Sequence, residues 1–433
     1  MTTAPATLPL VARTVPLADP GPLLDLLPDQ TPLAWVRRGE GLVGWGEAAR
    51  CEPSPGAERF AEAQTWWNAL LEHAVVRDEV GLPGTGPVAF GSFAFSKRSS
   101  SGGVIIVPEV VIGRRDRRWW MTTISRGAAL PGPGDQPSPD HLPSPGHLPT
   151  PAPVDGPGPV SYQDGALTGL VWVDRVAEAV RRIAAGELEK VVLARDLIAT
   201  TERPVDVRWL LANLAERYPG CWTFSVRGMI GATPEMLIRR EKGLVTSRVL
   251  AGTIRRTGDD AHDLALAASL ARSSKDLEEH EYAVRSVADA LAPHCTSTNV
   301  PESPFVLHLP NVMHLATDVT GVLADDTSAL GLAAALHPSA AVCGTPTDAA
   351  GRLIAEIEGM DRDRYAGPVG WFDASGDGEW GIALRSARLD DKDPRRLRLF
   401  AGCGIVAGSN PESELAEATA KLLPMREALG DLR

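Results

Sequence analysis

The stretch from Tyr365 to Lys421 decides the fold. It contains four segments: YAGPVGWFD (365–373), GEWGIALRSA (378–387), LFAGCGIVAG (399–408) and SNPESELAEATAK (409–421). The first three are short apolar or alternating runs bounded by Gly or Asp-Gly turns, a pattern typical of strands. Asn410 suits the cap of a helix and Pro411 its first position. Strands followed by a capped helix indicate an α+β protein.

The helix that follows Asn410 carries a row of charged side chains. Glu414, Glu417 and Lys421 recur at i, i+3 and i+7, so they share one helix face. Small-residue turns of the preceding strands lie next to this row in the sequence. Two carboxylates and a cation beside such turns suit a metal ion together with a small carboxylate-rich ligand, and waters and an anionic substrate complete the shell that Mg²⁺ prefers.

Composition limits the classes of function. The chain has 433 residues, a formal net charge of -12 and five scattered cysteines without a CxxC pair. The acidic balance argues against nucleic acid as the main partner, and the cysteines indicate neither a zinc site nor a disulfide framework. We expect a protein of the reducing cytoplasm, without a signal peptide and without a membrane span.

The chain divides into three parts by composition. Residues 1–130 are β-rich, with expected strands at 33–36, 41–45, 88–95 and 103–112 and a helical pattern over 58–80. Residues 131–160 are dominated by Pro, Gly, Ser and Asp, which predicts an extended loop or linker, with a ligand lid as the alternative. Residues 161–433 are more regular and contain the stretch that decides the fold.

The third part alternates between predicted helices and strands. Helices are predicted at 174–185, 207–218, 259–291 with a break near 273–274, 328–336 and 347–359. Antiparallel strands are predicted at 221–226, 228–232 and 235–240, further strands at 190–199, 244–249, 306–309 and 312–322, and a turn at 251–253. No internal repeat is evident.

Glu279 is the strongest single candidate for a metal ligand. It shares a helix face with Ala283 and Val287, and an inward carboxylate costs several kcal/mol unless it is paired or bound to a cation. The plainer interpretation is a slightly rotated helix with Glu279 in solvent, because Glu278 and Glu281 flank it. Glu279, Glu417 and Glu414 are therefore candidate metal ligands whose oxygens suit Mg²⁺.

Lys190 and Glu235 are candidates for proton transfer. Lys190 begins a strand and shares its face with apolar residues, and a lysine in a partly apolar pocket can act as a general base. Glu235 follows Thr233-Pro234, and a carboxyl group buried near apolar groups would hold its proton near neutrality and could serve as a general acid. The alternative for each is a solvated side chain at a strand end.

Other candidates would contact an anion. Arg385 suits a carboxylate because its guanidinium can bind both oxygens, and Tyr365 and His314 could donate hydrogen bonds. A structural salt bridge for Arg385 and a satisfied core position for His314 are the alternatives. Gly402, Gly404 and Gly408 form GxGxxxG, which imitates a dinucleotide fingerprint but lacks the strand–loop–helix context and the downstream acidic residue.

Nine strings together resemble the chorismate-utilising enzymes, over about residues 171–423. They are LEKVVLARDL, GATPEMLIRR, SRVLAGTIRR, SKDLEEHEYAV, MHLATDVTG, LHPSAAVCGTP, YAGPVGWFD, GEWGIALRSA and LFAGCGIVAGSNPESELAEATAK. This family comprises the isochorismate, salicylate, anthranilate and aminodeoxychorismate synthases. The resemblance implies a large α+β sandwich of mostly antiparallel sheets with flanking helices. The implied division is a variable β-rich N-terminal portion (1–130), a loop or linker (131–160) and a catalytic portion (161–433).

The resemblance also implies roles for individual residues. Lys190 matches the lysine that activates water to attack C2 of chorismate, and Glu235 the acid that protonates the departing C4 hydroxyl. Glu279 and Glu417 match the Mg²⁺ ligands, with Glu414 as a close partner. The remaining matches form the substrate cradle: Tyr365, Arg385, Lys421, Gly402 and Gly404 for the enolpyruvyl carboxylate, and His314, Gly252 and Thr253 beside the ring. Ala418 departs from the family, which commonly has Thr there.

Within the family, two positions favour water as the nucleophile. Ammonia-using members carry Gln where this chain has Lys190, and aminodeoxychorismate synthases often carry Lys where it has Ala251. The resemblance therefore favours an isochorismate synthase, with salicylate synthase as the alternative and an anthranilate or aminodeoxychorismate synthase component behind it. We expect chorismate as substrate, Mg²⁺ as cofactor, no glutaminase subunit and a monomer. Menaquinone and siderophore biosynthesis both remain open as destinations of the product.

A binding protein without catalytic activity is the contrasting class. Such a homologue would be expected to have lost at least one of Lys190, Glu235, Glu279 and Glu417, because an unused buried charge is costly. All four are present, which favours an enzyme.

Overall fold

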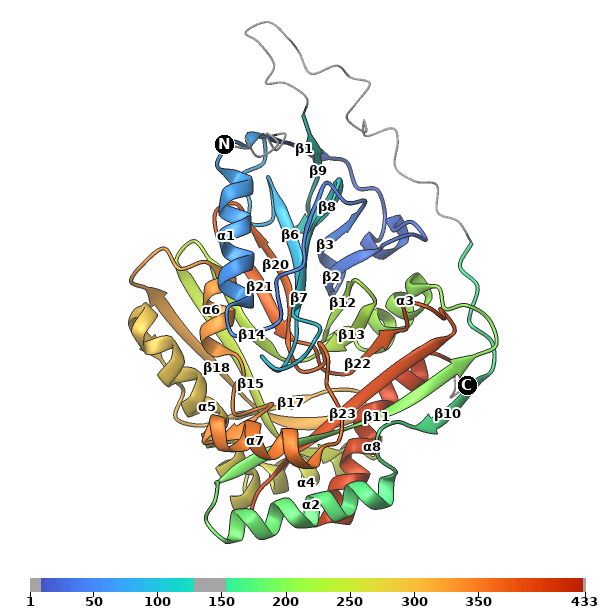
Figure 1. The fold of residues 1–433 in the computed structure, drawn as a ribbon, viewed down its shortest axis with the longest axis vertical. Coiled ribbons are helices and arrows are strands. Elements are labelled where there is room, and N and C mark those ends of the chain that lie inside the picture. Colours follow the sequence, from blue (N-terminus) through green and yellow to red (C-terminus); the bar gives the residue numbers. More distant parts are fainter. Residues whose placement is uncertain (1–8, 128–152, 431–433) are drawn as a thin grey trace, which may run out of the picture.

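Two large β-sheets pack against each other in the computed structural model, which describes residues 9–127 and 153–430 (Figure 1). Helices lie outside the sheets, so the predicted α+β sandwich is confirmed. Trp35 and Phe224 of one sheet belong to the same hydrophobic core as Phe93 and Trp380 of the other. Most of the predicted loop at 131–160 lies outside the described residues. Among the described helices, none has both the length and the apolarity to cross a membrane.

The first sheet contains strands from both the N-terminal and the C-terminal part of the chain. Its strands, in spatial order, are β10 (Val160–Asp164), β11 (Lys190–Thr201), β23 (Arg396–Ile405), β22 (Ser386–Leu389), β13 (Met229–Thr233), β12 (Trp222–Val226), β2 (Leu33–Arg37), β3 (Glu40–Trp45), β8 (Val110–Arg115), β9 (Arg118–Arg126), β1 (Leu10–Leu17) and β5 (Val75–Asp78), and β19 (Gly344–Thr345) also pairs with β11. Among the described strands of this sheet, β1 and β5 form its parallel pair and the others run antiparallel. The site strands β11 and β23 are long neighbours in it.

The second sheet is also shared between the two parts of the sequence. Its strands, in order, are β16 (Cys295–Asn299), β18 (Val312–Leu323), β15 (Leu244–Arg255), β14 (Met236–Glu241), β21 (Gly378–Ile382), β20 (Pro368–Asp373), β6 (Val88–Phe93), β7 (Gly103–Val107) and β4 (Ala49–Cys51), with β17 (Phe305–His308) beside β18. The pairing of β20 with β6 joins a C-terminal strand to an N-terminal one. Both sheets therefore need strands from before and after the 131–160 segment.

Helices cover the outer faces of the sheets. They are α1 (Arg59–Leu71), α2 (Gly169–Ala184), α3 (Val207–Arg217), α4 (Asp260–Leu270), α5 (Ser274–Leu291), α6 (Ala329–Leu336), α7 (Thr347–Ile357) and α8 (Pro411–Ala428). In Figure 1, α2 and α8 lie together beneath β11 and β23, whereas α5 and α6 lie beside β14, β15 and β18. The predicted break near Ser273 is confirmed, because the Ser273 hydroxyl caps α5 after α4 has ended.

Two predictions for the N-terminal part were wrong in detail. The single strand predicted at 103–112 is two strands, β7 and β8, which belong to different sheets. Pro108 lies between them, and proline removes the N–H that a continuous ladder needs. The helix predicted over 58–80 ends at Leu71, and the β-branched pair Val75-Val76 enters strand β5 instead. Tertiary pairing with β1 outweighed the helical spacing of Val75.

Two more corrections concern the strands that carry site residues. The segments predicted at 228–232 and 235–240 do not pair with each other, because the chain passes from the first sheet to the second at Pro234-Glu235. The turn predicted at 251–253 is a bulge inside β15, where the register against β18 shifts between Ala251 and Thr253. Gly252 adopts φ +71° there, a conformation that glycine takes without strain.

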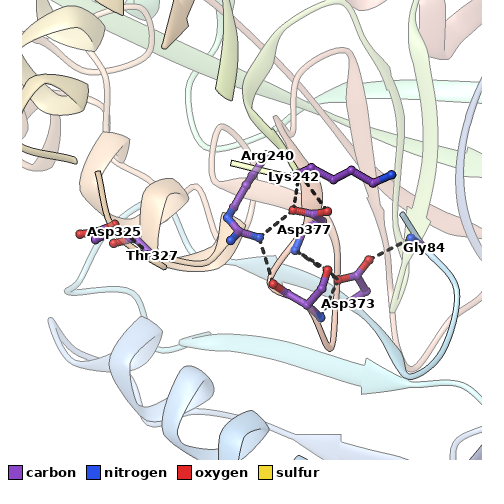
Figure 2. A network of polar contacts seen from close by, with 8 residues as sticks. Gly84, Arg240, Lys242, Asp325, Thr327, Asp373 and Asp377 are labelled. Atoms are coloured by element: carbon purple, nitrogen blue, oxygen red, sulfur yellow. Dashed lines mark hydrogen bonds and ion pairs between the residues drawn. The ribbon is translucent and has the colours of Figure 1, made fainter. Parts of the chain in front are cut away.

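The β20–β21 hairpin is held by a group of polar residues that we call the hairpin cluster: Gly84, Arg240, Asp373, Ser375 and Asp377. Figure 2 shows this cluster, with Gly84, Arg240, Asp373 and Asp377 labelled. Asp373 accepts hydrogen bonds from the backbone N–H groups of Gly84 at 2.9 Å, Ser375 at 2.9 Å and Asp377 at 3.2 Å. Asp377 accepts from Arg240 Nη1 at 2.7 Å and from the N–H of Lys242. This cluster fixes the turn that leads into Trp380 and Arg385.

Candidate active site

A pocket built from both sheets and from α5 and α8 collects most of the predicted site residues. Its wall includes ten of them: Glu235, Gly252, Thr253, Glu279, His314, Tyr365, Arg385, Gly402, Gly404 and Lys421. Lys190 and Glu417 adjoin this wall through ion pairs to Glu279 and Lys421. Glu414 pairs with Lys275 and lies beside Glu417. The structure thus brings together residues that lie more than 200 positions apart in the sequence.

Lys190 is buried at the start of β11. Its side chain is 0% exposed, and its Nζ lies 3.3 Å from Oε1 of Glu279, whose own side chain is 12% exposed. Lys190 pairs with Thr345 of β19 in the strand ladder, so its backbone is fixed from the first residue of the strand. The solvated alternatives for Lys190 and Glu279 are therefore wrong.

Glu279 keeps its negative charge although it is enclosed. Burial opposes that charge, but Lys190, Lys421 and Lys275 outweigh burial and hold the pKa of Glu279 below its usual value. Gly404 faces the same carboxylate, and a Cβ atom at that position would lie 2.0 Å from Glu279 Oε1 and 3.1 Å from Lys190 Cε. The absence of a side chain on Gly404 is what leaves room for the pair.

Glu235 has the opposite protonation state. It is 4% exposed at the crossing between β13 and β14. Burial raises its pKa to about 8, against a backbone hydrogen bond from Leu250 and the charges of Lys190, Lys421 and Arg385, which all lower it. A carboxylic acid that keeps its proton near neutrality can donate it to a leaving group.

Helices α5 and α8 contribute a row of alternating charges. Lys275 Nζ lies 2.8 Å from Oε1 of Glu414, and Lys421 Nζ lies 2.5 Å from Oε1 of Glu417. Burial raises the pKa of Glu414, with a further contribution from Glu417. Burial works against the charge of Lys421, but Glu417 and Cys403 raise its pKa above the ordinary lysine value. We call Lys190, Lys275, Glu279, Glu414, Glu417 and Lys421 the active-site cluster.

Arg385 and His314 form a second polar group on the pocket wall. His314 lies on β18, and its Nε2 accepts a hydrogen bond from Arg385 Nη2 at 3.0 Å. Burial, followed by the charge of Arg385, lowers the pKa of His314 well below its usual value, so the ring is neutral. Its Nδ1 then carries the proton and faces Thr253 Oγ1 at 3.1 Å and the Gly252 carbonyl at 3.3 Å. Among the described residues, Nη1 of Arg385 is buried without a partner, which leaves a donor for an anion in the pocket.

Tyr365 and the β23 glycines complete the wall. The ring of Tyr365 stacks on Phe400, with ring centroids 4.8 Å apart, and burial raises its pKa to about 12. Its hydroxyl therefore stays protonated at neutral pH. Lys421 Nζ donates to the Gly402 carbonyl at 3.1 Å, which positions the ammonium group at the strand.

Sequence reasoning missed Lys275 and Asp276. Lys275 pairs with Glu414, and Asp276 contacts the position of Gly252, where an added Cβ would lie 2.9 Å from Asp276 Cβ. The spacing that could have found them is present, because Lys275 and Asp276 precede Glu279 by four and three residues on one helix. Cys403 was also missed: its Sγ, with carboxylate oxygens of Glu414 and Glu417, forms a group whose ligand atoms lie within 4.8 Å of one another.

Comparison with known proteins gives a consistent set of relatives. The chain is 43% identical over 267 residues to the isochorismate synthase DhbC of Bacillus subtilis, covering 59% of this chain and 66% of that one. It is 37% identical over 260 residues to the isochorismate synthase EntC of Escherichia coli, covering 59% and 66%. The aligned stretches thus span slightly less than two thirds of these curated relatives.

Solved structures extend the similarity to almost the whole chain. A crystal structure described as a putative 2,3-dihydroxybenzoate-specific isochorismate synthase, DhbC from Bacillus anthracis, matches with a TM-score of 0.75 and 32% identity over 94% of this chain and 98% of that one. MenF, the menaquinone-specific isochorismate synthase from Escherichia coli, matches with a TM-score of 0.79 and 26% identity over 98% and 95%. The family model of chorismate binding enzymes matches residues 28–430. The family expected from the nine strings is confirmed: this chain belongs to the chorismate binding enzymes.

Proposed function

We propose that the protein is an isochorismate synthase, which converts chorismate into isochorismate by adding water at C2 and releasing the hydroxyl group from C4. The observation that carries the proposal is that an enclosed lysine, Lys190, and an enclosed acid, Glu235, occur at one site, where the charge of Lys190 acts on Glu235 and burial keeps Glu235 protonated. A poor nucleophile and a poor leaving group need a base and an acid at once, and each contributes about 10²–10⁴-fold. The similarity to curated isochorismate synthases supports the same reaction.

Lys190 and Glu235 would each carry out one of two proton transfers. In its neutral form Lys190 Nζ takes a proton from the attacking water, and Glu235 gives its proton to the departing C4 oxygen, which leaves as water. The substrate thereby gains and loses one water, so the reaction is an isomerisation. Proton exchange with solvent then returns both groups to their starting forms. The pKa of Glu235, about 8, keeps the acid loaded at neutral pH.

The cations of the pocket suit a dianionic substrate. Arg385 has a buried guanidinium nitrogen without a protein partner among the described residues, and Lys421 and the Tyr365 hydroxyl lie on the same pocket wall. These groups would bind the enolpyruvyl carboxylate. Neutral His314 and Thr253 would lie beside the ring, where they add hydrogen bonds without adding charge.

Mg²⁺ is the proposed cofactor, held by Glu279, Glu417 and Glu414. The donor set fits, because carboxylate oxygens are the ligands that Mg²⁺ prefers, and carboxylate oxygens of Glu414 and Glu417 lie within 4.8 Å of one another. Charge also fits: three carboxylates and a dianionic substrate together carry more negative charge than Lys190, Lys275, Lys421 and Arg385 can offset, so further positive charges are needed. The bound ion would supply those charges and polarise the ring carboxylate.

Water is the proposed nucleophile because this chain has Lys190 at the position where the ammonia-using relatives have glutamine. The proposal therefore needs no glutaminase subunit. The further expectation of a monomeric cytoplasmic enzyme rests on the sequence.

Product analysis tests the proposal. Purified protein is incubated with chorismate and Mg²⁺ without an ammonium source, and the products are separated by liquid chromatography. We expect isochorismate, lost on addition of a chelator and reduced about 10²–10⁴-fold in Lys190→Ala. The matched control Lys392→Ala, at an exposed lysine that does not line the active pocket, should keep full activity.

Three outcomes would contradict the proposal or a part of it. Salicylate with pyruvate as products would assign the chain to the salicylate synthases, because that reaction also begins with isochorismate. Chorismate that binds without turnover would leave a binding protein. A chelator-resistant activity would remove Mg²⁺ and its three carboxylate ligands from the mechanism.

A further inference from the structure

A second, larger cavity lies next to the active pocket. It has a volume of about 800 Å³ and lies between α1, the 95–99 loop, the end of α6 and α7. In Figure 1 these three helices follow one another down the same side of the molecule. Ligand sites for small molecules typically measure about 300–1,000 Å³, so this cavity can accept a small organic compound.

The cavity wall is cationic although the protein is acidic. Five cationic side chains line it against three carboxylates, a net charge of +2 in a chain whose formal net charge is -12. They are Arg59, Lys97, Arg98, Arg352 and Arg362, against Asp348, Glu358 and Asp361. Two of the carboxylates are already engaged, Glu358 with Arg362 and Asp361 with the Ser99 hydroxyl. A cationic wall of this kind favours an anionic ligand.

Three of these cations are available. Lys97, Arg98 and Arg352 are exposed, and within the described residues no carboxylate lies within ion-pair distance of them. Deeper in the wall, Arg59 is 5% exposed and its Nε has no hydrogen-bond partner among the described residues. A buried guanidinium N–H without a partner indicates that a ligand or water completes it.

The other side of the cavity is aromatic and apolar. Phe60 and Phe95 line it together with Ala61, Ala334 and Met360. His337 adds a neutral ring, because burial lowers its pKa to about 3. The face of Phe60 stacks on Phe93, and Arg362 lies over the face of Phe95. A ligand ring would therefore meet the remaining apolar edges and side chains of this wall while its carboxylate meets the cations.

One buried ion pair separates this cavity from the active pocket. Arg362 lines both of them. Its guanidinium donates to the Val342 carbonyl at 2.9 Å and to the Val192 carbonyl at 2.7 Å. Its partner Glu358 accepts a hydrogen bond from the Ala194 N–H at 2.7 Å. The pair therefore occupies the edge of β11 between its contacts to β19 and to β10, on the strand that begins with Lys190.

We propose that the second cavity is an effector site for a small ring-bearing carboxylate, sensed at the active pocket through the Arg362–Glu358 pair and strand β11. The cationic rim and the aromatic wall supply the ligand chemistry. The contacts of Arg362 and Glu358 with β11 supply the connection, since a shift of this pair moves the backbone that carries Lys190. The binding part stands independently of the proposed function, whereas the coupling part rests on it.

Binding is tested with 4-fluorobenzoate as the probe, followed by ¹⁹F NMR on the full chain. The variant Gly351→Leu fills the cavity from α7, because a Cβ at Gly351 meets nothing closer than Cys343 Sγ at 3.9 Å. It also raises helix propensity, so the fold should persist. We expect the variant to abolish probe binding and to keep its thermal unfolding temperature or raise it.

A charge variant gives a second, independent measurement. Replacing Lys97, Arg98 and Arg352 by Ala should weaken probe binding about tenfold or more, since each contributes a modest electrostatic attraction. The matched control replaces the exposed Arg117, Arg175 and Arg217 by Ala, with the same change in net charge, and should leave the affinity unchanged. Equal displacement of the probe by inorganic phosphate would reduce the site to an ion site and overturn the ring-carboxylate assignment.

Chorismate is itself a ring-bearing carboxylate, so we use it as a competitor to find out which of the two pockets holds the probe. Probe binding that survives Gly351→Leu and disappears on adding chorismate would place the probe in the active pocket and overturn the proposal.

If the coupling exists, a saturating concentration of the probe changes the affinity for chorismate about fivefold or more. Gly351→Leu should remove this change while keeping basal activity. Chorismate affinity is measured by direct binding, so a failure of turnover would count against the proposed function alone. An unchanged affinity with intact probe binding would overturn the coupling.

Discussion

The active-site cluster and the hairpin cluster both enclose carboxylates beside cations, and they differ in which groups meet those carboxylates. In the hairpin cluster, backbone N–H groups supply most of the donors: Asp373 accepts from Gly84 and Ser375, and Asp377 accepts from Lys242. Asp377 also accepts from the Arg240 guanidinium, and Figure 2 shows Asp377 between Arg240 and Lys242. In the active-site cluster, Glu279, Glu414 and Glu417 are each met by a lysine ammonium group.

This difference explains why one cluster is architectural and the other can be functional. Backbone donors are fixed by the fold, and the buried Arg240 is itself held by the Ser375 carbonyl, so the hairpin carboxylates cannot exchange partners without disrupting the turn. A lysine ammonium group lies at the end of four rotatable carbons and can move aside, so its carboxylate can accept a cation in its place. A site that must bind and release ligands needs charge pairs of the second kind.

The largest expected effect is the loss of catalysis in Glu235→Gln. Gln cannot donate a proton to the leaving group, so kcat should fall about 10²–10⁴-fold. Because burial places the pKa of Glu235 at about 8, wild-type activity should decline as pH rises through about 8, and the residual activity of the variant should lack that decline. The measurement is kcat against pH with chorismate and Mg²⁺.

The pH dependence of the free energy of unfolding provides an independent check on the raised pKa of Glu235. The pKa of Glu235 is higher in the folded state than the usual value of 4.5, so its contribution to stability is present at low pH and is lost as pH rises through about 8. Glu235→Gln should therefore be more stable than the wild type at about pH 9. Glu241→Gln, at the far end of β14, should change neither activity nor this pH dependence. An unchanged kcat in Glu235→Gln would remove Glu235 from the mechanism.

The second prediction removes one partner from the hairpin cluster. Arg240→Met leaves the buried carboxylate of Asp377 without its cation, and breaking such a pair costs about 3–5 kcal/mol of the free energy of unfolding. Activity per folded molecule should be retained, because Arg240 does not line the active pocket. Chemical denaturation measures the first effect, and active-site titration with turnover measures the second.

A neighbouring arginine on the same strand supplies the control. Arg239 is 40% exposed and pairs with Glu379, so Arg239→Met should cost no more than about 1 kcal/mol. If Arg240→Met lowered kcat with its stability intact, the hairpin cluster would share in catalysis and the contrast between the two clusters would fail.

Local patterns in the sequence were sufficient for the elements that close the active pocket. The strands and helix between Tyr365 and Lys421 were predicted because Asp-Gly turns, alternation and the Asn410 cap act within a few residues. The shared face of Glu414, Glu417 and Lys421 followed from helix periodicity alone, and Lys421 pairs with Glu417 as that spacing requires. The individual candidates came together only through the nine family strings.

Long-range pairing could not be predicted in the same way. The chain changes sheets at Pro234-Glu235 and at Pro108, and no periodicity marks which sheet a strand joins. The bulge at Gly252 depends on a register shift against β18, so its sequence resembled a turn. Lys275 pairs with Glu414 only because the fold brings α5 next to α8, and local sequence does not show this. The second cavity arises from segments at 57–61, 95–99 and 334–362, which no local pattern connects.

The smallest effect is expected from Asp373→Asn in the hairpin cluster. The amide nitrogen would face a backbone donor, such as the Gly84 N–H that now donates to Asp373 Oδ2. Leaving one buried donor unsatisfied costs about 1–3 kcal/mol of the free energy of unfolding at neutral pH. Activity should be unaffected, so the variant separates turn architecture from catalysis. Urea denaturation at about pH 7.5 measures the loss.

The pH dependence of that loss sharpens the comparison further. Burial raises the pKa of Asp373 to about 6, against the hydrogen bonds that lower it, so in the wild type this group stabilises the fold at low pH and loses that contribution as pH rises through about 6. Asn does not titrate, so the difference between wild type and variant should be larger at about pH 5 than at about pH 7.5. Other groups titrate equally in both proteins and cancel. A difference that shrinks on acidification would mean that the backbone donors outweigh burial and hold Asp373 ionised, which would make the hairpin cluster a carboxylate site as fully charged as the active-site cluster.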